Sequence, residues 1–119
     1  MRLSEDLRLR CKAYAARVVR LYGQLPTRRK EVQVLGHQLL RSGTSVAAHT
    51  REASRARSTA EFCSKLDGML QEADESLLWL ELLKEECGIS GKEIDFLLNE
   101  TNEIIAMFVS IVSRSRKNI

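Results

Sequence analysis

Apolar side chains recur every three to four residues along most of this chain, which is the spacing of helices with one buried face. The pattern predicts four helices, over residues 4–22, 27–57, 58–87 and 90–116. Short connections separate them, and the sequence contains only one proline and six glycines. We therefore expect an all-α fold, an up-down-up-down antiparallel four-helix bundle with a single domain over residues 1–119.

Several serines and glycines stand where these helices should begin and end. Ser4 is a candidate N-cap, and Ser58 and Ser90 each open a Ser-x-x-Glu capping box. Gly23 and Gly88 are candidate C-terminal stops. These positions predict where the chain turns.

The first turn of the helix over 27–57 is unusual because it contains the cations Arg28, Arg29 and Lys30. Positive charge at a helix N-terminus opposes the helix dipole. This placement indicates an outside partner such as a phosphate group, or an exposed loop in which the charges cost little. Backbone N–H groups at the same helix end would add to a phosphate site.

The same helix has two faces of small residues. The first is a heptad series that starts bulky and becomes small or polar: Val32, Leu35, Leu39, Ser42, Val46, His49, Ala53 and Ala56. The opposite face is small in its middle and cationic at its ends: Arg41, Thr44, Ala48, Arg51 and Arg55. A helix with two thin faces is predicted to pack on both sides, within its own bundle and against another subunit.

In the helix over 58–87, Glu72, Glu75 and Trp79 lie on a face beside the apolar seam. Trp79 is expected to be mostly buried, with its ring N–H bonded to a polar group. His49 and the two glutamates are candidates for an acid/base group, but a buried structural hydrogen-bond network is the favoured interpretation. We expect no enzymatic activity.

Charge divides the chain into two unlike halves. Residues 1–57 contain 13 basic and 4 acidic side chains, a balance of +9, whereas residues 58–119 contain 6 and 12, a balance of −6. Such asymmetry predicts either a polyanionic partner or the meeting of basic and acidic faces, within one bundle or between subunits.

Other sequence signals exclude several classes of site. The three cysteines, Cys11, Cys63 and Cys87, show no CxxC spacing and are expected to be reduced thiols in a cytoplasmic protein. The two histidines are too isolated for a metal site, and no cofactor is expected. No apolar run approaches the roughly 20 residues of a membrane span, so we expect no membrane partner.

Two long segments resemble a known family. They are Gln38-Leu-Leu-Arg-Ser-Gly-Thr-Ser-Val46 with Arg51-Glu-Ala53, and Glu72-Ala-Asp-Glu-Ser76 with Trp79-Leu-Glu-Leu-Leu83. The sequence is identified as similar to the bacterial four-helix-bundle proteins encoded within intervening sequences of 23S ribosomal RNA genes. The same fold serves as the accessory variability protein of diversity-generating retroelements. His49 and Thr50 depart from the family's usual asparagine and bulky residue.

The resemblance implies a homopentamer, with five bundles around a central channel. Family members in retroelements bind nucleic acid and a reverse transcriptase, so RNA or DNA and a reverse transcriptase are the implied partners. Most members have no assigned activity.

Our first hypothesis is therefore a non-enzymatic, oligomeric, basic-faced bundle that binds RNA or DNA through phosphate contacts. The candidate nucleic-acid-binding residues are Arg10, Arg17, Arg20, Arg28, Arg29, Lys30, Arg41, Arg51, Arg55 and Arg57. The candidate structural or oligomer residues are Ser42, Thr44, Ala48, His49, Glu52, Glu72, Glu75 and Trp79. The alternative is a structural homopentamer whose basic face is covered by an acidic face of its neighbour.

Overall fold

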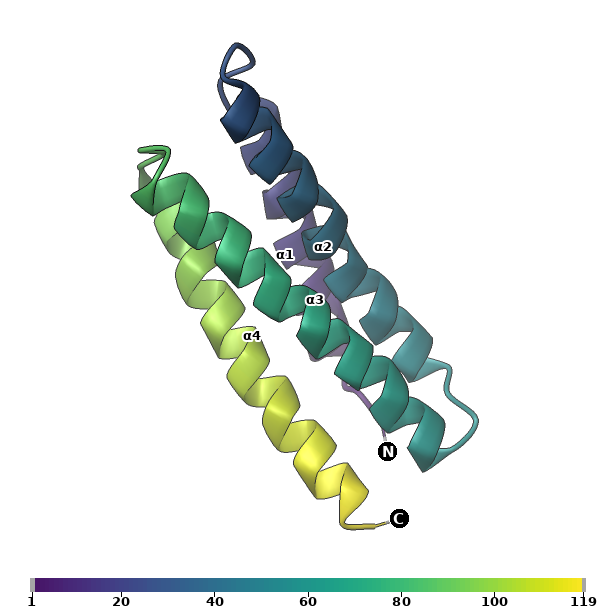
Figure 1. Ribbon diagram of the computed structural model, residues 1–119. Coiled ribbons are helices and arrows are strands. Elements are labelled where there is room, and N and C mark those ends of the chain that lie inside the picture. The colour runs from purple at the N-terminus through teal and green to yellow at the C-terminus, as the bar shows by residue number, and fades with distance from the viewer. Residues whose placement is uncertain (1, 119) are drawn as a thin grey trace.

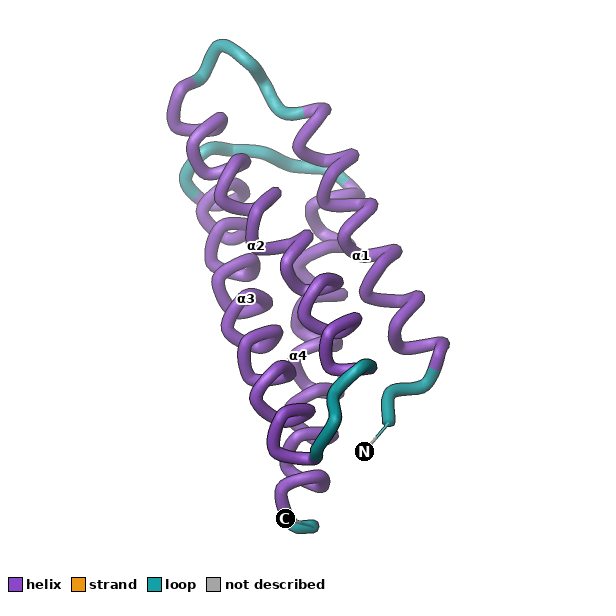
Figure 2. The backbone as a smooth tube through the Cα atoms, turned by 90° about the vertical axis from the view of Figure 1, so that its right-hand side faces the viewer, coloured by secondary structure: helices purple, strands orange, loops and turns teal. Residues whose placement is uncertain are grey.

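The computed structural model describes residues 2–118 and folds them into four helices. They are α1 (Glu5–Gln24), α2 (Lys30–Ser54), α3 (Thr59–Glu85) and α4 (Lys92–Arg116). The helices form an elongated antiparallel bundle of 49 × 21 × 20 Å (Figure 1). Figure 2 shows helices and loops and no strand in the described part of the chain. The expected all-α four-helix bundle is confirmed.

The four helices contact one another in chain order around the bundle. α2 packs most extensively on α3, and α1 and α4 share the smallest contact. The α1–α2 and α3–α4 loops lie at one end, while the α2–α3 loop and both chain termini lie at the other (Figure 1). The two ends therefore present different sets of loop residues.

Two of the expected N-caps are confirmed. Ser4 Oγ accepts a hydrogen bond from the Leu7 amide at 3.2 Å, and Ser58 Oγ accepts one from the Glu61 amide at 3.0 Å. Each bond satisfies an amide that the first helical turn leaves without a main-chain partner. These serines fix where α1 and α3 begin.

The capping box predicted at Ser90 is wrong. α4 begins after Gly91, and no side chain caps this helix end. Gly88 and Gly91 have φ values of +72° and +128°, in the region that favours glycine. These two glycines turn the chain between α3 and α4 and leave Ser90 outside the helix.

The stop predicted at Gly23 is also wrong, because α1 continues to Gln24. The helix ends instead at Leu25, whose amide donates to the Tyr22 carbonyl at 3.2 Å. Leu25 is buried, and its side chain occupies the space left by the missing side chain of Gly36 in α2. Leu25 thus leaves the helix with its side chain packed against α2, and Pro26 follows it and cannot continue the helix.

α2 is shorter than expected at both ends. It begins at Lys30 rather than near Thr27, and it ends at Ser54 rather than near Arg57. Arg28 and Arg29 thus precede the helix, and Arg29 is its N-cap residue, still beside the positive end of the helix dipole. The Arg29 guanidinium donates to the Cys87 carbonyl at 2.7 Å and ties this loop to the end of α3.

α2 buries two parallel heptad series rather than one. Gly36, Gly43 and Thr50 face α1, where Gly43 lies against Val18. The predicted series faces α3 instead, and Ser42 Oγ bonds Ser76 Oγ at 2.7 Å. Because α2 touches two neighbours, it needs two adjacent stripes, so its seam is wider than the sequence pattern indicated.

His49 was predicted to lie in the buried seam of α2, and this prediction is wrong. Its side chain keeps 32% of its surface exposed, whereas the next residue, Thr50, is buried against α1. His49 packs over Gly68 of α3 at the edge of the helix contact. The imidazole therefore lies beside the core rather than within it.

Replacing Gly43 by alanine is expected to lower the free energy of unfolding. The added Cβ would lie 2.9 Å from both methyl carbons of Val18, so the α1–α2 contact must shift. Overpacking costs about 1–3 kcal/mol, which exceeds the roughly 1 kcal/mol that alanine gains over glycine within a helix. Gly23→Ala is the control, because nothing lies within 4 Å of its added Cβ. Urea denaturation measures the stability of the two variants. Equal stability would contradict the close approach of α1 and α2 at Gly43.

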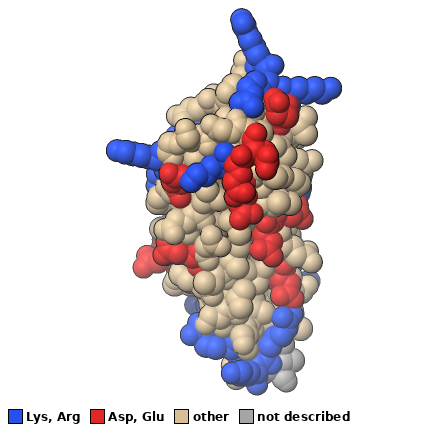
Figure 3. Space-filling view, turned by 60° about the vertical axis from the view of Figure 1, so that its left-hand side comes forward, with Lys and Arg blue, Asp and Glu red and all other residues tan. Residues whose placement is uncertain are grey.

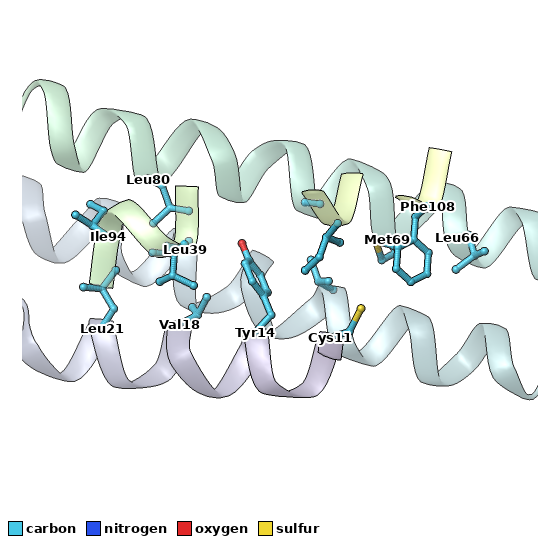
Figure 4. Packing of buried hydrophobic residues seen from close by; sticks show 14 of the residues in the cluster. Cys11, Tyr14, Val18, Leu21, Leu39, Leu66, Met69, Leu80, Ile94 and Phe108 are labelled. Carbon is cyan, nitrogen blue, oxygen red and sulfur yellow. The ribbon is translucent and has the colours of Figure 1, made fainter. Parts of the chain in front are cut away.

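The core runs along the bundle, with one apolar stripe from each helix (Figure 4). One hydroxyl from each helix interrupts it. Tyr14 bonds Thr101 at 2.7 Å, Ser42 bonds Ser76 at 2.7 Å, and Tyr14 also interacts with Ser76. Burial raises the pKa of Tyr14 to about 12. Ser76 and Thr101 also reach carbonyls of their own helices, at 2.9 and 2.6 Å, so they keep a partner whatever the register. Tyr14 has no such partner, and sliding α1 by a turn would leave its buried hydroxyl unpaired, which favours the observed register of α1.

Trp79 is only partly buried, and its predicted hydrogen bond is absent. The ring Nε1 is itself buried and has no hydrogen-bond partner among the described residues. The neighbouring Ser76, Leu80 and Leu83 fill the seam of α3 instead. Trp79 therefore covers the edge of the core with its ring.

α4 is long and apolar enough to cross a membrane by length and composition, with a mean hydropathy of 1.2 over its most apolar window. A third of that window is buried within the bundle. Core helices of water-soluble proteins have the same length and composition, so these two properties do not by themselves indicate a membrane span.

Candidate nucleic-acid interface

Arg10 and Arg17, both predicted to bind phosphate, instead hold α1 to α4. Arg10 makes a two-bond pair with Glu100 at 2.8 and 2.6 Å, and Arg17 makes one with Glu93 at 3.0 and 3.1 Å. Arg17 also lies over the ring of Phe96, 3.5 Å from its centroid. The hydrogen bond from Arg17 lowers the pKa of Glu93. These two arginines are used within the bundle.

Arg41 holds α2 to α3 in the same way. Its guanidinium contacts Glu72 at 3.2 Å and Glu75 at 2.8 Å. His49 lies two turns further along α2 and faces Glu52, with 3.7 Å between Nδ1 and Oε1. The candidate acid/base group of His49, Glu72 and Glu75 is therefore not assembled, because the glutamates are paired with an arginine elsewhere.

Glu52 also contacts Lys65 of α3 at 3.3 Å. Arg57, at the end of the loop that follows α2, lies 3.6 Å from Glu61 and remains 90% exposed. Arg29 contacts Glu31 at 3.6 Å in addition to the Cys87 carbonyl. Half of the ten candidate cations thus have acidic neighbours within the chain.

The other five candidate cations are exposed and make no ion pair among the described residues. They are Arg20, Arg28, Lys30, Arg51 and Arg55. Arg28 and Lys30 lie at the end of the bundle where the α1–α2 loop is, and Arg51 and Arg55 lie at the opposite end. These positions remain open to a partner.

Arg51 and Arg55 line a hollow of about 240 Å³ between α1 and α2. Arg8 and Lys12 line it from α1, and Glu5 is its one carboxylate. The two hydroxyls in its wall are already used as donors, because Thr50 bonds the Ala47 carbonyl and Ser54 bonds the Thr50 carbonyl. We call this feature the basic hollow, and its four cations are its main binding groups.

Arg8 and Lys12 were missing from the predicted site. The signal that would have found them is the register of the antiparallel pair α1 and α2. Val18 lies opposite Gly43, and Cys11 interacts with Thr50, so the first turns of α1 face the last turns of α2. Arg8 and Lys12 are one turn apart, as are Arg51 and Arg55, so the two pairs face each other across the hollow.

The small face of α2 is exposed along the outside of the bundle. Ala48 is exposed, and Thr44 is half-buried with its Oγ1 bonded to the Leu40 carbonyl at 2.7 Å. Both line a second hollow of about 420 Å³ that also includes Arg51, Glu52 and Arg55. This surface of small side chains is the part of α2 that the other three helices do not cover.

Acidic and basic groups gather on different parts of the surface. On the face shown in Figure 3, acidic side chains run through the middle, and basic side chains gather at the two ends and also lie among acidic ones in the upper half. The exposed acids of α4 include Asp95 and Glu103, and its last turn contains Arg114 and Arg116. The ends of the bundle are therefore the regions that favour an anionic partner.

The described residues offer no other obvious chemistry. No group of three or more His, Cys, Asp or Glu side chains is placed to hold a metal ion within residues 2–118. Cys11, Cys63 and Cys87 are buried free thiols, and burial raises the pKa of Cys11 to about 11. Cys11 is therefore a poor nucleophile, because its reactive thiolate is disfavoured.

The model of the 23S rRNA-intervening sequence protein family matches residues 6–110. The chain is also similar to a crystal structure, at 1.70 Å, of a protein with unknown function from the S23 ribosomal protein family from Bacteroides thetaiotaomicron VPI-5482. The two sequences are 39% identical with a TM-score of 0.81, over 89% of this chain and 97% of that one. No curated protein sequence gives a significant match. This chain belongs to the family of 23S rRNA-intervening sequence proteins.

Proposed function

We propose that this protein is a non-enzymatic, cytoplasmic nucleic-acid-binding protein that holds RNA or DNA by its phosphate groups. The observation that supports this most is the basic hollow, where four cations face one carboxylate and no ion pair within the described chain occupies them. Exposed arginines and lysines that are not held in ion pairs are the groups that release counterions from a polyanion.

The rest of the face agrees with backbone recognition. No aromatic side chain lines the basic hollow, so base stacking contributes little there. Arg20, Arg28 and Lys30 add cations at the other end of the same helix pair. Binding should therefore tolerate changes of base sequence and weaken steeply with salt.

Reversing the charge of Arg51 and Arg55 is expected to abolish most binding at low salt. Each phosphate contact contributes about −0.9 to the slope of log affinity against log salt on duplex DNA, so the double-glutamate variant should lose roughly two units of slope. The measurement is a salt titration by fluorescence anisotropy on one RNA and one DNA probe. Lys84→Glu with Lys92→Glu is the control, because it changes the net charge equally on α3 and α4, at the end of the bundle away from the basic hollow.

The two variants separate a local site from a general charge effect. Equal weakening by both would mean that net charge alone attracts the probe. If the wild-type protein bound neither probe at low salt, the basic residues would serve assembly instead.

Assembly is the second candidate function, and the exposed small face of α2 favours it. Thr44 and Ala48 give a surface that another helix can approach closely. We propose a homopentamer, as the family resemblance implies, with a reverse transcriptase as a candidate partner. Sedimentation equilibrium should give five times the 13.5 kDa chain mass. A 13.5 kDa species at micromolar concentration would contradict the pentamer, and Ala48→Glu should break it if α2 forms the interface.

A further inference from the structure

The size and charge of the basic hollow go beyond what binding the internal phosphates of a nucleic-acid strand requires. Its volume of about 240 Å³ is below the roughly 300–1,000 Å³ of sites for drug-sized ligands. A phosphate group with part of its hydration shell fits this space, whereas a stacked base has no aromatic wall to lie on.

The charge of the hollow exceeds that of one internal phosphate. Arg8, Lys12, Arg51 and Arg55 against Glu5 leave an excess of three positive charges around a single small space. A phosphodiester within a strand carries one negative charge. A terminal phosphate monoester carries about −1.5 to −2 at pH 7 and three acceptor oxygens, so it matches the hollow better.

The four cations approach from two directions, which also suits a terminal group. Arg8 and Lys12 come from α1, and Arg51 and Arg55 come from α2. Arginine can bind two phosphate oxygens at once through its fork of N–H donors. The three oxygens of a monoester can therefore be shared between the two helices.

We infer that the basic hollow binds the terminal phosphate of a nucleic-acid strand. This inference rests on the proposed function and narrows its ligand from phosphate backbone in general to strands that end in a phosphate monoester. The remaining backbone then follows the exposed cations of α1 and α2.

The experiment compares three RNA probes of one sequence, ending in hydroxyls only, in a 5′-phosphate or in a 3′-phosphate. Each phosphorylated probe is expected to bind the wild-type protein about tenfold or more tightly than the hydroxyl probe, because the added contacts are charge-assisted. Arg8→Gln with Lys12→Gln should lower the affinity for all three probes and remove the difference between them. Arg28→Gln, an exposed loop cation at the other end, should keep the preference.

The possible outcomes separate this inference from the proposed function. Equal affinity for all three probes, each bound at low salt, would overturn the terminal-phosphate site and leave nucleic-acid binding intact. Binding of no probe would overturn both. Displacement of the phosphorylated probes by equimolar inorganic phosphate, or equal affinity for a phosphoserine peptide, would assign the hollow to another source of phosphate and also overturn it.

Discussion

Phe108→Ala is expected to lower the free energy of unfolding by about 3–5 kcal/mol, the usual cost of removing a buried phenylalanine side chain. Phe108 is fully buried and lies near Met69 and Leu66 of α3 in the core (Figure 4). Interiors are packed too densely for neighbours to collapse into the whole space, so the loss of transfer energy is accompanied by a cavity. Urea denaturation followed by circular dichroism measures the change.

Phe96→Ala is the matched control on the same helix. Phe96 keeps 38% of its surface exposed and serves mainly as the platform beneath the Arg17 guanidinium. Its removal should cost about 1 kcal/mol, from lost cation–π attraction and a small loss of burial. If the two variants were equally stable, α4 would not turn Phe108 into the core and Phe96 toward solvent.

Arg10→Met is expected to destabilise the protein by about 2–3 kcal/mol, below the 3–5 kcal/mol for a fully buried pair. The side chain of Glu100 is only 11% exposed, and Arg10 supplies the charge and the two hydrogen bonds that offset its burial. Without Arg10 the carboxylate remains in the α1–α4 contact with little compensation. The 34% exposure of Arg10 lets water enter and reduces the penalty.

A second variant tests whether the loss of stability in Arg10→Met comes from the unpaired Glu100 carboxylate. Arg10→Met combined with Glu100→Gln removes the charge that was left unpaired, so it should recover much of the lost stability. Thermal unfolding at neutral pH compares the two variants with the wild-type protein. A double variant as unstable as Arg10→Met would contradict this explanation and indicate that packing of the arginine stem matters more.

The sequence pattern was sufficient for the helices because their apolar spacing is local information. Residues such as Leu39 and Val46 repeat every seven positions and lie on one face whatever surrounds the helix. The capping serines Ser4 and Ser58 are local signals as well. The capping box at Ser90 does not form because Gly91 beside it adopts a positive φ and precedes the helix. A sequence pattern does not show which of two adjacent turn residues ends the loop.

The candidate site was less predictable because ion pairing depends on how helices are rotated against one another. Arg17 and Glu93 are separated by 76 residues in the sequence, and nothing near either residue indicates that they meet. The sequence alone therefore did not distinguish among the ten candidate cations. In the structure, several of them are paired with residues of other helices. Arg8 and Lys12 gain importance only through the register of α1 against α2.

Both termini emerge at the same end of the bundle, as Figures 1 and 2 show. Domains with this property often tolerate a circular permutation, in which the old ends are joined and the chain is opened elsewhere. The α3–α4 turn, with exposed Gly88, Ser90 and Gly91, is a suitable new opening. In such a permutant α4 would become the first helix and would be linked directly to α1, with which it now shares the smallest contact.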